Sequence, residues 1–146
     1  MQAKNTNLLI SGAVVYRDHG GKRKWLVVKH PNEDKWEIPK ITVRRGESSV
    51  RASLRMTCEM AGMNTRILEE AGRTSGSAVL NGKSVPVKYY YYLMVQRSAG
   101  EMIGFEAFQW LEYTQALKKI FLKREKEMLK GAKEVLKESE KAKKKK

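Results

Sequence analysis

One amphipathic helix, set between blocks of strand-like sequence, constrains the fold of this chain more than any other feature. Ser48 or Ser49 can cap its N-terminus, and Gly62 is the type of residue that ends a helix. Apolar and small residues recur between them at helical spacing. Their spacing predicts a buried stripe made of Val50, Leu54, Thr57, Cys58 and Ala61.

Strand-like sequence lies on both sides of this helix. Runs rich in β-branched and aromatic residues predict strands over 8–16, 25–29, 65–71, 75–80, 84–95 and 105–111. Residues 36–43 form a further extended stretch, because Pro39 excludes a helix there. Asn81-Gly82 has the composition of a hairpin turn. The order of elements therefore indicates an α+β fold with helices packed on sheets.

The C-terminal part is predicted to be helical. Thr114 is expected to cap a helix that breaks near Phe121 and resumes from Lys123 to about Lys137. We expect one domain over residues 1–137, followed by a disordered Lys-rich tail over 138–146.

The charge of the chain points to anionic partners. Thirty Lys and Arg residues against sixteen Asp and Glu give a formal net charge of +14. The last ten residues contribute +4, so residues 1–136 still carry +10. A body this basic favours nucleotide phosphates, RNA or an acidic protein face. The alternative is a solvated surface that uses charge for solubility.

Several classes of protein are excluded. The single cysteine, Cys58, excludes an intrachain disulfide framework and a cysteine-based zinc cluster. The sequence contains no apolar run of the roughly 18–20 residues that a membrane span needs. Residues 1–7 are polar and lack the apolar core of a secretory signal. We therefore expect a cytoplasmic or other reducing intracellular location, without membrane association.

The segment around the helix resembles the sequence box of the Nudix hydrolases. Seven residues separate Glu47 from Arg55, and Gly62 falls seven positions after Arg55, as that box requires. Over roughly residues 8–137 the pattern is similar to the diadenosine-polyphosphate hydrolase branch, including Trp36 with Pro39-Lys40. The resemblance implies the Nudix fold, with mixed β-sheets sandwiched between α-helices. It also implies cleavage of a nucleoside diphosphate linked to another moiety.

The box departs from the family where the family carries acidic residues. Two of the three carboxylates on the helix are replaced by Met56 and Met60, and only Glu59 remains. The first Gly of the box falls at Ile41, and a further Glu of the diadenosine branch falls at about Gly104.

These replacements bear directly on catalysis. Hydrolysis of a phosphoanhydride needs divalent cations, and Mg²⁺ prefers hard oxygen ligands to thioethers. The sequence therefore predicts no metal site and no catalytic residue, with Glu59 catalytic only if the enzyme is active.

Basic side chains near the box could replace the metal in phosphate binding. Arginine binds phosphate in a bidentate manner. Met56 and Met60 lie outside the predicted stripe and are expected to line the former active-site cleft, or alternatively to pack under a loop. The predicted ligand-binding residues are Lys40, Arg44, Arg45, Arg51, Met56 and Met60. The predicted structural residues are Glu47, Arg55 and Gly62, of which Glu47 and Arg55 are expected to form an ion pair.

One function fits these residues best, and two alternatives remain open. We predict a Nudix-fold protein with a non-catalytic site that binds a nucleotide or RNA phosphate without a cofactor. The first alternative is an active pyrophosphohydrolase on dinucleoside polyphosphates or related nucleotides, using Mg²⁺ or Mn²⁺ and carboxylates recruited from elsewhere. The second is a protein-interaction module, acting through the basic surface or through the stripe of Leu129, Ala132, Val135 and Leu136.

Overall fold

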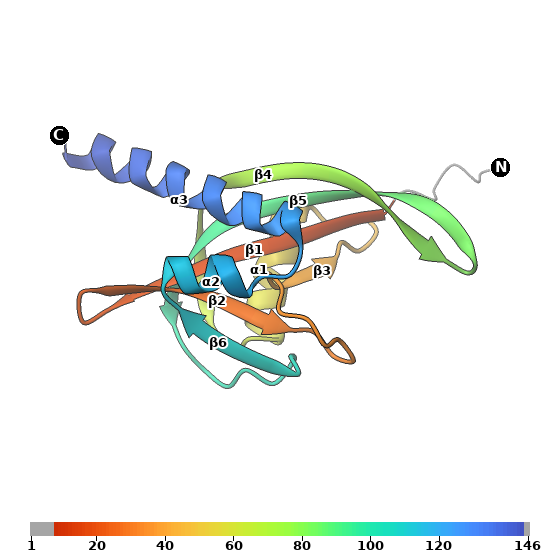
Figure 1. Cartoon of the computed structure of the whole chain (residues 1–146), viewed down its shortest axis with the longest axis horizontal. Coiled ribbons are helices and arrows are strands. Elements are labelled where there is room, and N and C mark those ends of the chain that lie inside the picture. The colour runs from red at the N-terminus through yellow and green to blue at the C-terminus, as the bar shows by residue number, and fades with distance from the viewer. Residues whose placement is uncertain (1–7, 145–146) are drawn as a thin grey trace.

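The computed structural model describes residues 8–144, and every statement about structure refers to them. The segment 1–7, where no secretory signal is expected, and the last two lysines lie outside these residues. The elements in chain order are β1 (Leu8–His19), β2 (Lys22–Lys29), β3 (Lys40–Thr42), α1 (Ser49–Glu59), β4 (Asn64–Leu80), β5 (Lys83–Ser98), β6 (Ala107–Leu111), α2 (Tyr113–Lys119) and α3 (Lys123–Lys144) (Figure 1).

The six strands form one mixed sheet. Its main path runs β4-β5-β1-β2-β6, and β3 pairs with β1 beside that path. β1 and β5 are parallel, whereas the other pairs are antiparallel. The α+β class and the mixed sheet predicted from the sequence are both confirmed.

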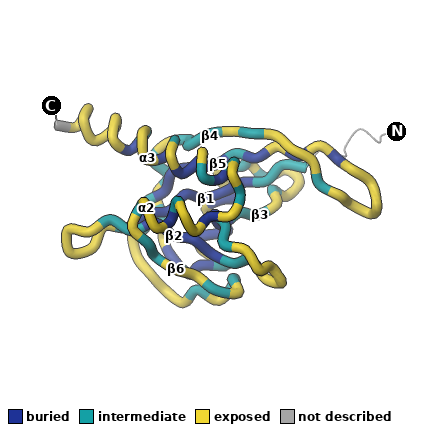
Figure 2. Tube along the Cα trace, in the orientation of Figure 1, coloured by how far each residue is buried: buried dark blue, intermediate teal, exposed yellow. Residues whose placement is uncertain are grey.

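Helices cover the two faces of the sheet because β1 alternates its apolar side chains. Val14 and Tyr16 pack with α2 and α3 in one core, which contains Ala116 and Leu129. Ala13 and Val15 point the other way and pack against α1 in a second core. The buried residues therefore lie along the centre of the sheet, and the exposed ones lie along its ends and turns (Figure 2).

Two predicted strands are continuous in the structure. The stretches 65–71 and 75–80 belong to the single strand β4, which forms a long hairpin with β5 around Asn81-Gly82. Register shifts near Leu68 and Ala71 allow β4 to bend without ending. The polar residues between the two stretches therefore belong to the strand and not to a loop.

The C-terminal helices agree with the sequence prediction except at their ends. The predicted break before Lys123 is confirmed. Thr114 does not cap α2, because it lies inside the helix. Glu112 occupies the N-cap position, and its side chain makes no cap bond. The predicted disorder from residue 138 is wrong as far as Lys144, because α3 continues to that residue. Lys and Glu are good helix formers, and Glu140 pairs with Arg23 at 2.7 Å, which ties this end of the helix to the β1–β2 hairpin.

The predicted buried stripe of α1 is confirmed at Thr57 and Ala61 but is wrong at its other three positions. Val50, Leu54 and Cys58 are exposed, whereas the buried residues of the helix are Ala52, Ser53, Met56 and Thr57. Ser53 Oγ donates to the Val50 carbonyl at 2.9 Å, and Thr57 Oγ1 lies 2.8 Å from Thr65 Oγ1. Hydrogen bonds satisfy these hydroxyls, so polar residues can occupy the buried face.

Over residues 8–144, every helix is either too short or too polar to cross a membrane.

Candidate functional site

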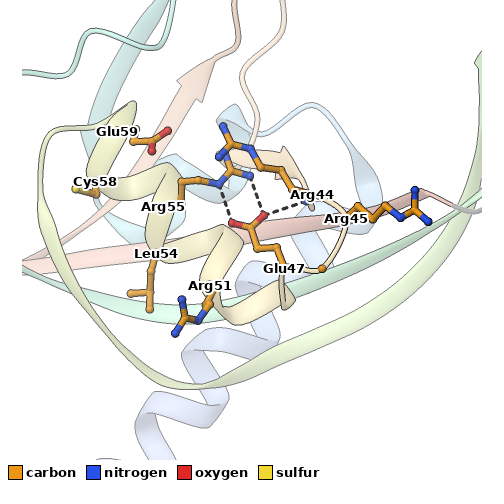
Figure 3. A pocket seen from close by; sticks show the side chains of 9 residues that line it. Arg44, Arg45, Glu47, Arg51, Leu54, Arg55, Cys58 and Glu59 are labelled. Carbon is orange, nitrogen blue, oxygen red and sulfur yellow. Dashed lines mark hydrogen bonds and ion pairs between the residues drawn. The ribbon is translucent and has the colours of Figure 1, made fainter.

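The loop between β3 and α1 is held against the helix by Glu47. Its carboxylate accepts two hydrogen bonds from Arg55, from Nε at 2.8 Å and from a terminal guanidinium nitrogen at 3.0 Å. It also accepts the backbone N–H of Arg44 at 2.9 Å. The structure thus forms the ion pair that the sequence predicts, and it adds a backbone contact that closes the loop (Figure 3).

These contacts stabilise the ionised form of Glu47. The hydrogen bonds from Arg55, followed by the bond from the Arg44 N–H, lower the pKa of Glu47 to about 2. The same contact raises the pKa of Arg55. Both groups of the pair therefore remain charged at neutral pH.

The N-terminus and the C-terminus of α1 are both fixed by sequence-local features. Ser48 Oγ accepts the N–H of Arg51 at 3.1 Å, which is the N-cap bond expected from the sequence. Gly62, with φ of 62°, donates its N–H to the Cys58 carbonyl at 3.1 Å. Its left-handed conformation turns the chain from the helix into β4.

A surface groove of about 680 Å³ lies along α1 and the preceding loop. We call it the arginine groove; its lining residues are Arg44, Arg45, Gly46, Glu47, Arg51, Leu54, Arg55, Cys58 and Glu59. Figure 3 shows Arg45 and Arg51 directed away from the Glu47–Arg55 pair. Three of the predicted phosphate-binding residues, Arg44, Arg45 and Arg51, line this groove.

The charge in this groove is largely uncompensated. Only Arg55 among its four arginines forms an ion pair with a groove carboxylate. Within residues 8–144, no carboxylate lies within ion-pair distance of Arg44, Arg45 or Arg51, and all three side chains are exposed. Their guanidinium groups are therefore available to an anionic ligand.

Lys40 does not belong to this groove. Its Nζ lies 3.0 Å from the buried Glu125 carboxylate and also contacts Glu37. The structure therefore does not place Lys40 with the arginines, as the sequence predicts, because two carboxylates surround its ammonium group outside the groove.

The sequence also predicts that Met56 lines the cleft, and the structure corrects this. The Met56 side chain is 0% exposed and packs in the core between α1 and the sheet. Met60 is half-buried and packs against the same core. The alternative interpretation of these two residues, packing under a neighbouring segment, is the one that the structure supports.

The segment before β6 covers Met60 and the end of α1. The Gly104 N–H donates to the Met60 carbonyl at 2.8 Å, and a Cβ at position 104 would lie 2.4 Å from Met60 Cβ. A Cβ at position 100 would lie 2.2 Å from the Gly62 carbonyl oxygen. The glycines therefore allow this segment to lie directly on Met60 and Gly62 at the end of α1.

The remaining acidic residues do not form the oxygen-rich site that a divalent cation requires. Glu59 is exposed on the wall of the arginine groove, while Met56 is buried in the core and Met60 packs half-buried against it. Among residues 8–144, no three His, Cys, Asp or Glu side chains lie close enough together to hold a metal ion. The donor set around α1 does not fit Mg²⁺.

Sequence reasoning misses two residues of the groove. Helical spacing assigns Leu54 and Cys58 to the core, but both line the groove and are exposed. Ser53, which lies outside the predicted stripe, is buried instead, beside the correctly predicted Thr57. Helical periodicity alone does not reveal this rotation, because it treats a hydrogen-bonded hydroxyl as a polar surface group.

The sheet, its two helical layers and the box-like helix together define the Nudix fold, and comparison with solved structures shows this fold. The Nudix domain of NrtR from Shewanella oneidensis, solved with ADP ribose, aligns with a TM-score of 0.70 and 19% identity over 92% of this chain and 91% of that one. An Ap4A hydrolase from C. elegans aligns with a TM-score of 0.67 and 24% identity over 88% and 97%. The E. coli dihydroneopterin triphosphate pyrophosphohydrolase aligns at 0.66 with 12% identity over 83% and 91%.

No protein-family model matches the sequence, and no curated protein matches it significantly.

Proposed function

We propose that this protein binds the phosphate groups of a nucleotide or of RNA in the arginine groove and does not hydrolyse them. One observation carries the proposal: Arg44, Arg45 and Arg51 line a groove of about 680 Å³, and within residues 8–144 no carboxylate lies within ion-pair distance of any of these three side chains. Guanidinium groups bind phosphate oxygens in a bidentate manner and need no metal to do so.

The surroundings of α1 support the second half of the proposal. The two positions at which a Nudix box would carry further carboxylates hold Met56, which is buried in the core, and Met60, which is half-buried against it. Glu59 is the one acidic residue left at these three positions. A single carboxylate does not provide the set of oxygen ligands with which metal-assisted phosphoanhydride hydrolysis proceeds.

The ligand class is supported by the fold and by charge. The NrtR domain that shares the fold was solved with ADP ribose, which is a nucleoside diphosphate joined to a sugar. The net charge of +14 also favours phosphate-bearing ligands over neutral ones.

A second function, phosphoanhydride hydrolysis, is favoured by the enzymes that share the fold. An Ap4A hydrolase and a pyrophosphohydrolase are among them. Such an activity would use Glu59 together with carboxylates from other parts of the chain. Glu101 and Glu106 are candidates, because they lie on either side of Gly104, the residue that packs on Met60.

The experiment compares binding with turnover. Isothermal titration with ADP ribose, ADP and a short RNA is carried out in EDTA, and hydrolysis of diadenosine polyphosphates and of ADP ribose is measured with Mg²⁺ or Mn²⁺. We expect binding without metal and no turnover. Turnover of about 1 s⁻¹ or more, abolished by Glu59→Gln, would overturn the proposal.

A matched pair of variants assigns the binding to the groove. Replacing Arg44, Arg45 and Arg51 by Ala is expected to weaken nucleotide binding by about tenfold or more. Replacing three exposed lysines of α3, Lys137, Lys141 and Lys143, by Ala removes the same charge and is expected to change affinity by less than about twofold.

A further inference from the structure

The β4–β5 hairpin extends beyond the helices as an arm, and one of its faces continues the side of the sheet against which α1 packs. The arm is visible at the end of the sheet in Figure 1. Its strands pair Arg73 with Tyr90 and Ser75 with Lys88. Paired residues of neighbouring strands project to the same face, so these four side chains share one face of the arm.

The register of the sheet shows which face this is. Tyr92, two residues after Tyr90 on β5, lies on the same face, and its hydroxyl contacts Ser49 Oγ at the start of α1. Ser11, which pairs with Tyr90 in the parallel ladder, donates its Oγ to the Ser49 carbonyl at 2.7 Å. The N-terminus of α1 therefore rests on the rows of Tyr90 and Tyr92, and Lys88 lies one step further along the arm.

Arg73 and Tyr90 form a cation–π contact on this face. The Arg73 guanidinium carbon lies 4.1 Å from the centre of the Tyr90 ring. Glu70 fixes the guanidinium through a 2.8 Å contact, and the Arg73 side chain is still 57% exposed. A guanidinium is flat, and this one is held by Glu70 and remains exposed, so a nucleic-acid base can stack on it.

Groups that bind a phosphate backbone surround this contact. A second cavity of about 350 Å³ is lined by Arg73, Thr74, Ser75, Lys88 and Tyr90. Lys88 is exposed, and within residues 8–144 no carboxylate lies within ion-pair distance of it. The face thus combines a stacking platform, a cation and the hydroxyl residue Ser75.

We propose that the arginine groove and this face of the arm form one continuous binding surface for single-stranded nucleic acid. The inference rests on the proposed function, and it selects a strand of several nucleotides as the ligand in place of a mononucleotide. Backbone phosphates lie on the groove arginines and on Lys88, and an unpaired base stacks on Arg73. A duplex does not present such a base, so the surface selects single strands.

The test measures how affinity depends on ligand length and on the arm. Fluorescence anisotropy with labelled RNA and DNA decamers, and titration with ADP, are carried out on the wild-type protein and on a variant carrying Arg73→Ala and Lys88→Ala. We expect the variant to bind decamers roughly tenfold more weakly and ADP unchanged. We also expect a shallower salt dependence, by about 0.7 in slope for each backbone phosphate that the variant no longer neutralises.

Lys83 provides the matched control. It is exposed on the same hairpin, and it precedes Lys88 by an odd number of residues in an unbroken register of β5, which places it on the opposite face from Lys88. Lys83→Ala is expected to leave decamer affinity within about twofold of the wild-type value. If Lys83→Ala reduced decamer affinity as much as the variant carrying Arg73→Ala and Lys88→Ala does, the inference would be overturned, because the strand would then be attracted diffusely to the whole arm.

The remaining outcomes separate this inference from the proposed function. If ADP binds in the groove but the arm variant binds decamers like the wild type, the inference is wrong and the proposed function stands. If neither ADP nor a decamer binds, the proposed function itself fails. Equal binding of a duplex also overturns the inference, whereas a preference for RNA or for DNA identifies the natural strand and supports it.

Discussion

The Glu125 carboxylate is fully buried and lies 3.0 Å from the ammonium nitrogen of Lys40. It also accepts the Ile38 N–H at 2.9 Å and the Tyr91 hydroxyl at 2.6 Å. Burial, with Glu125 as the next cause, raises the pKa of Tyr91 above its ordinary value, so the phenol remains a donor. This network fastens the segment before β3 to the start of α3, and it keeps Lys40 away from the arginine groove.

The Lys40–Glu125 pair gives the first prediction. Lys40→Met is expected to destabilise the protein by about 3 kcal/mol, because it leaves the buried carboxylate without its cation. Denaturant unfolding measures this change. Adding Glu125→Gln to Lys40→Met is expected to recover part of the stability, since the amide carries no charge. If the protein carrying Lys40→Met alone were as stable as the wild type, Lys40 would not stabilise the buried Glu125 carboxylate.

The second prediction concerns stability at acid pH. The pKa of Glu47 is about 2 in the folded state against an ordinary value of 4.5, so the unfolded chain binds the extra proton first. The stabilisation is complete above about pH 4.5 and is lost as the pH falls toward 2. Glu47→Gln is expected to flatten the dependence of the free energy of unfolding on pH over this window. An unchanged profile in the variant would contradict the assignment.

The third prediction concerns restoring a box carboxylate. Met56→Glu places a carboxylate in a fully buried position and is expected to destabilise the fold by about 3 kcal/mol without creating hydrolase activity. Met56→Leu conserves volume and is expected to cost less than about 1.5 kcal/mol. Thermal unfolding and a hydrolysis assay with Mg²⁺ check both variants. A stable, hydrolytic Met56→Glu protein would show that this side chain faces an open catalytic cleft.

The fourth prediction concerns the segment that covers Met60. Gly104→Ala brings a methyl group to within 2.4 Å of Met60 Cβ, so the segment has to move. We expect a decrease of about 1–3 kcal/mol in the free energy of unfolding, measured with denaturant. Gly76→Ala is the control, because its Cβ would lie at an ordinary 3.6 Å from Tyr89. Equal stability of the Gly104 variant and the wild type would contradict the close packing of this segment on α1.

The fifth prediction concerns the end of α3. Removing residues 138–146 is expected to lower the helical circular-dichroism signal and to cost less than about 1 kcal/mol, since the Arg23–Glu140 ion pair is exposed. A truncation that leaves the helical signal unchanged would favour the disordered tail predicted from the sequence.

The order of elements and the form of α1 could be predicted from the sequence. Ser48 and Gly62 delimit α1 through local cap geometry, and the Glu47–Arg55 spacing brings together a side chain of the helix and one of its preceding loop. Contacts of this kind depend on neighbours in the chain, so a residue pattern is enough to specify them.

Only the tertiary structure determined which side of α1 is buried and which cations remain available. Ser53 is buried, with its hydroxyl bonded to the Val50 carbonyl, whereas Leu54 and Cys58 are exposed, and the stripe predicted from the sequence has the reverse arrangement. Lys40 is bound by Glu125, a residue distant in the sequence, whereas Arg51 has no such partner in the part of the chain described. Periodicity reports the spacing of side chains, but partners contributed by distant segments decide burial and charge compensation, and these exist only in the folded chain.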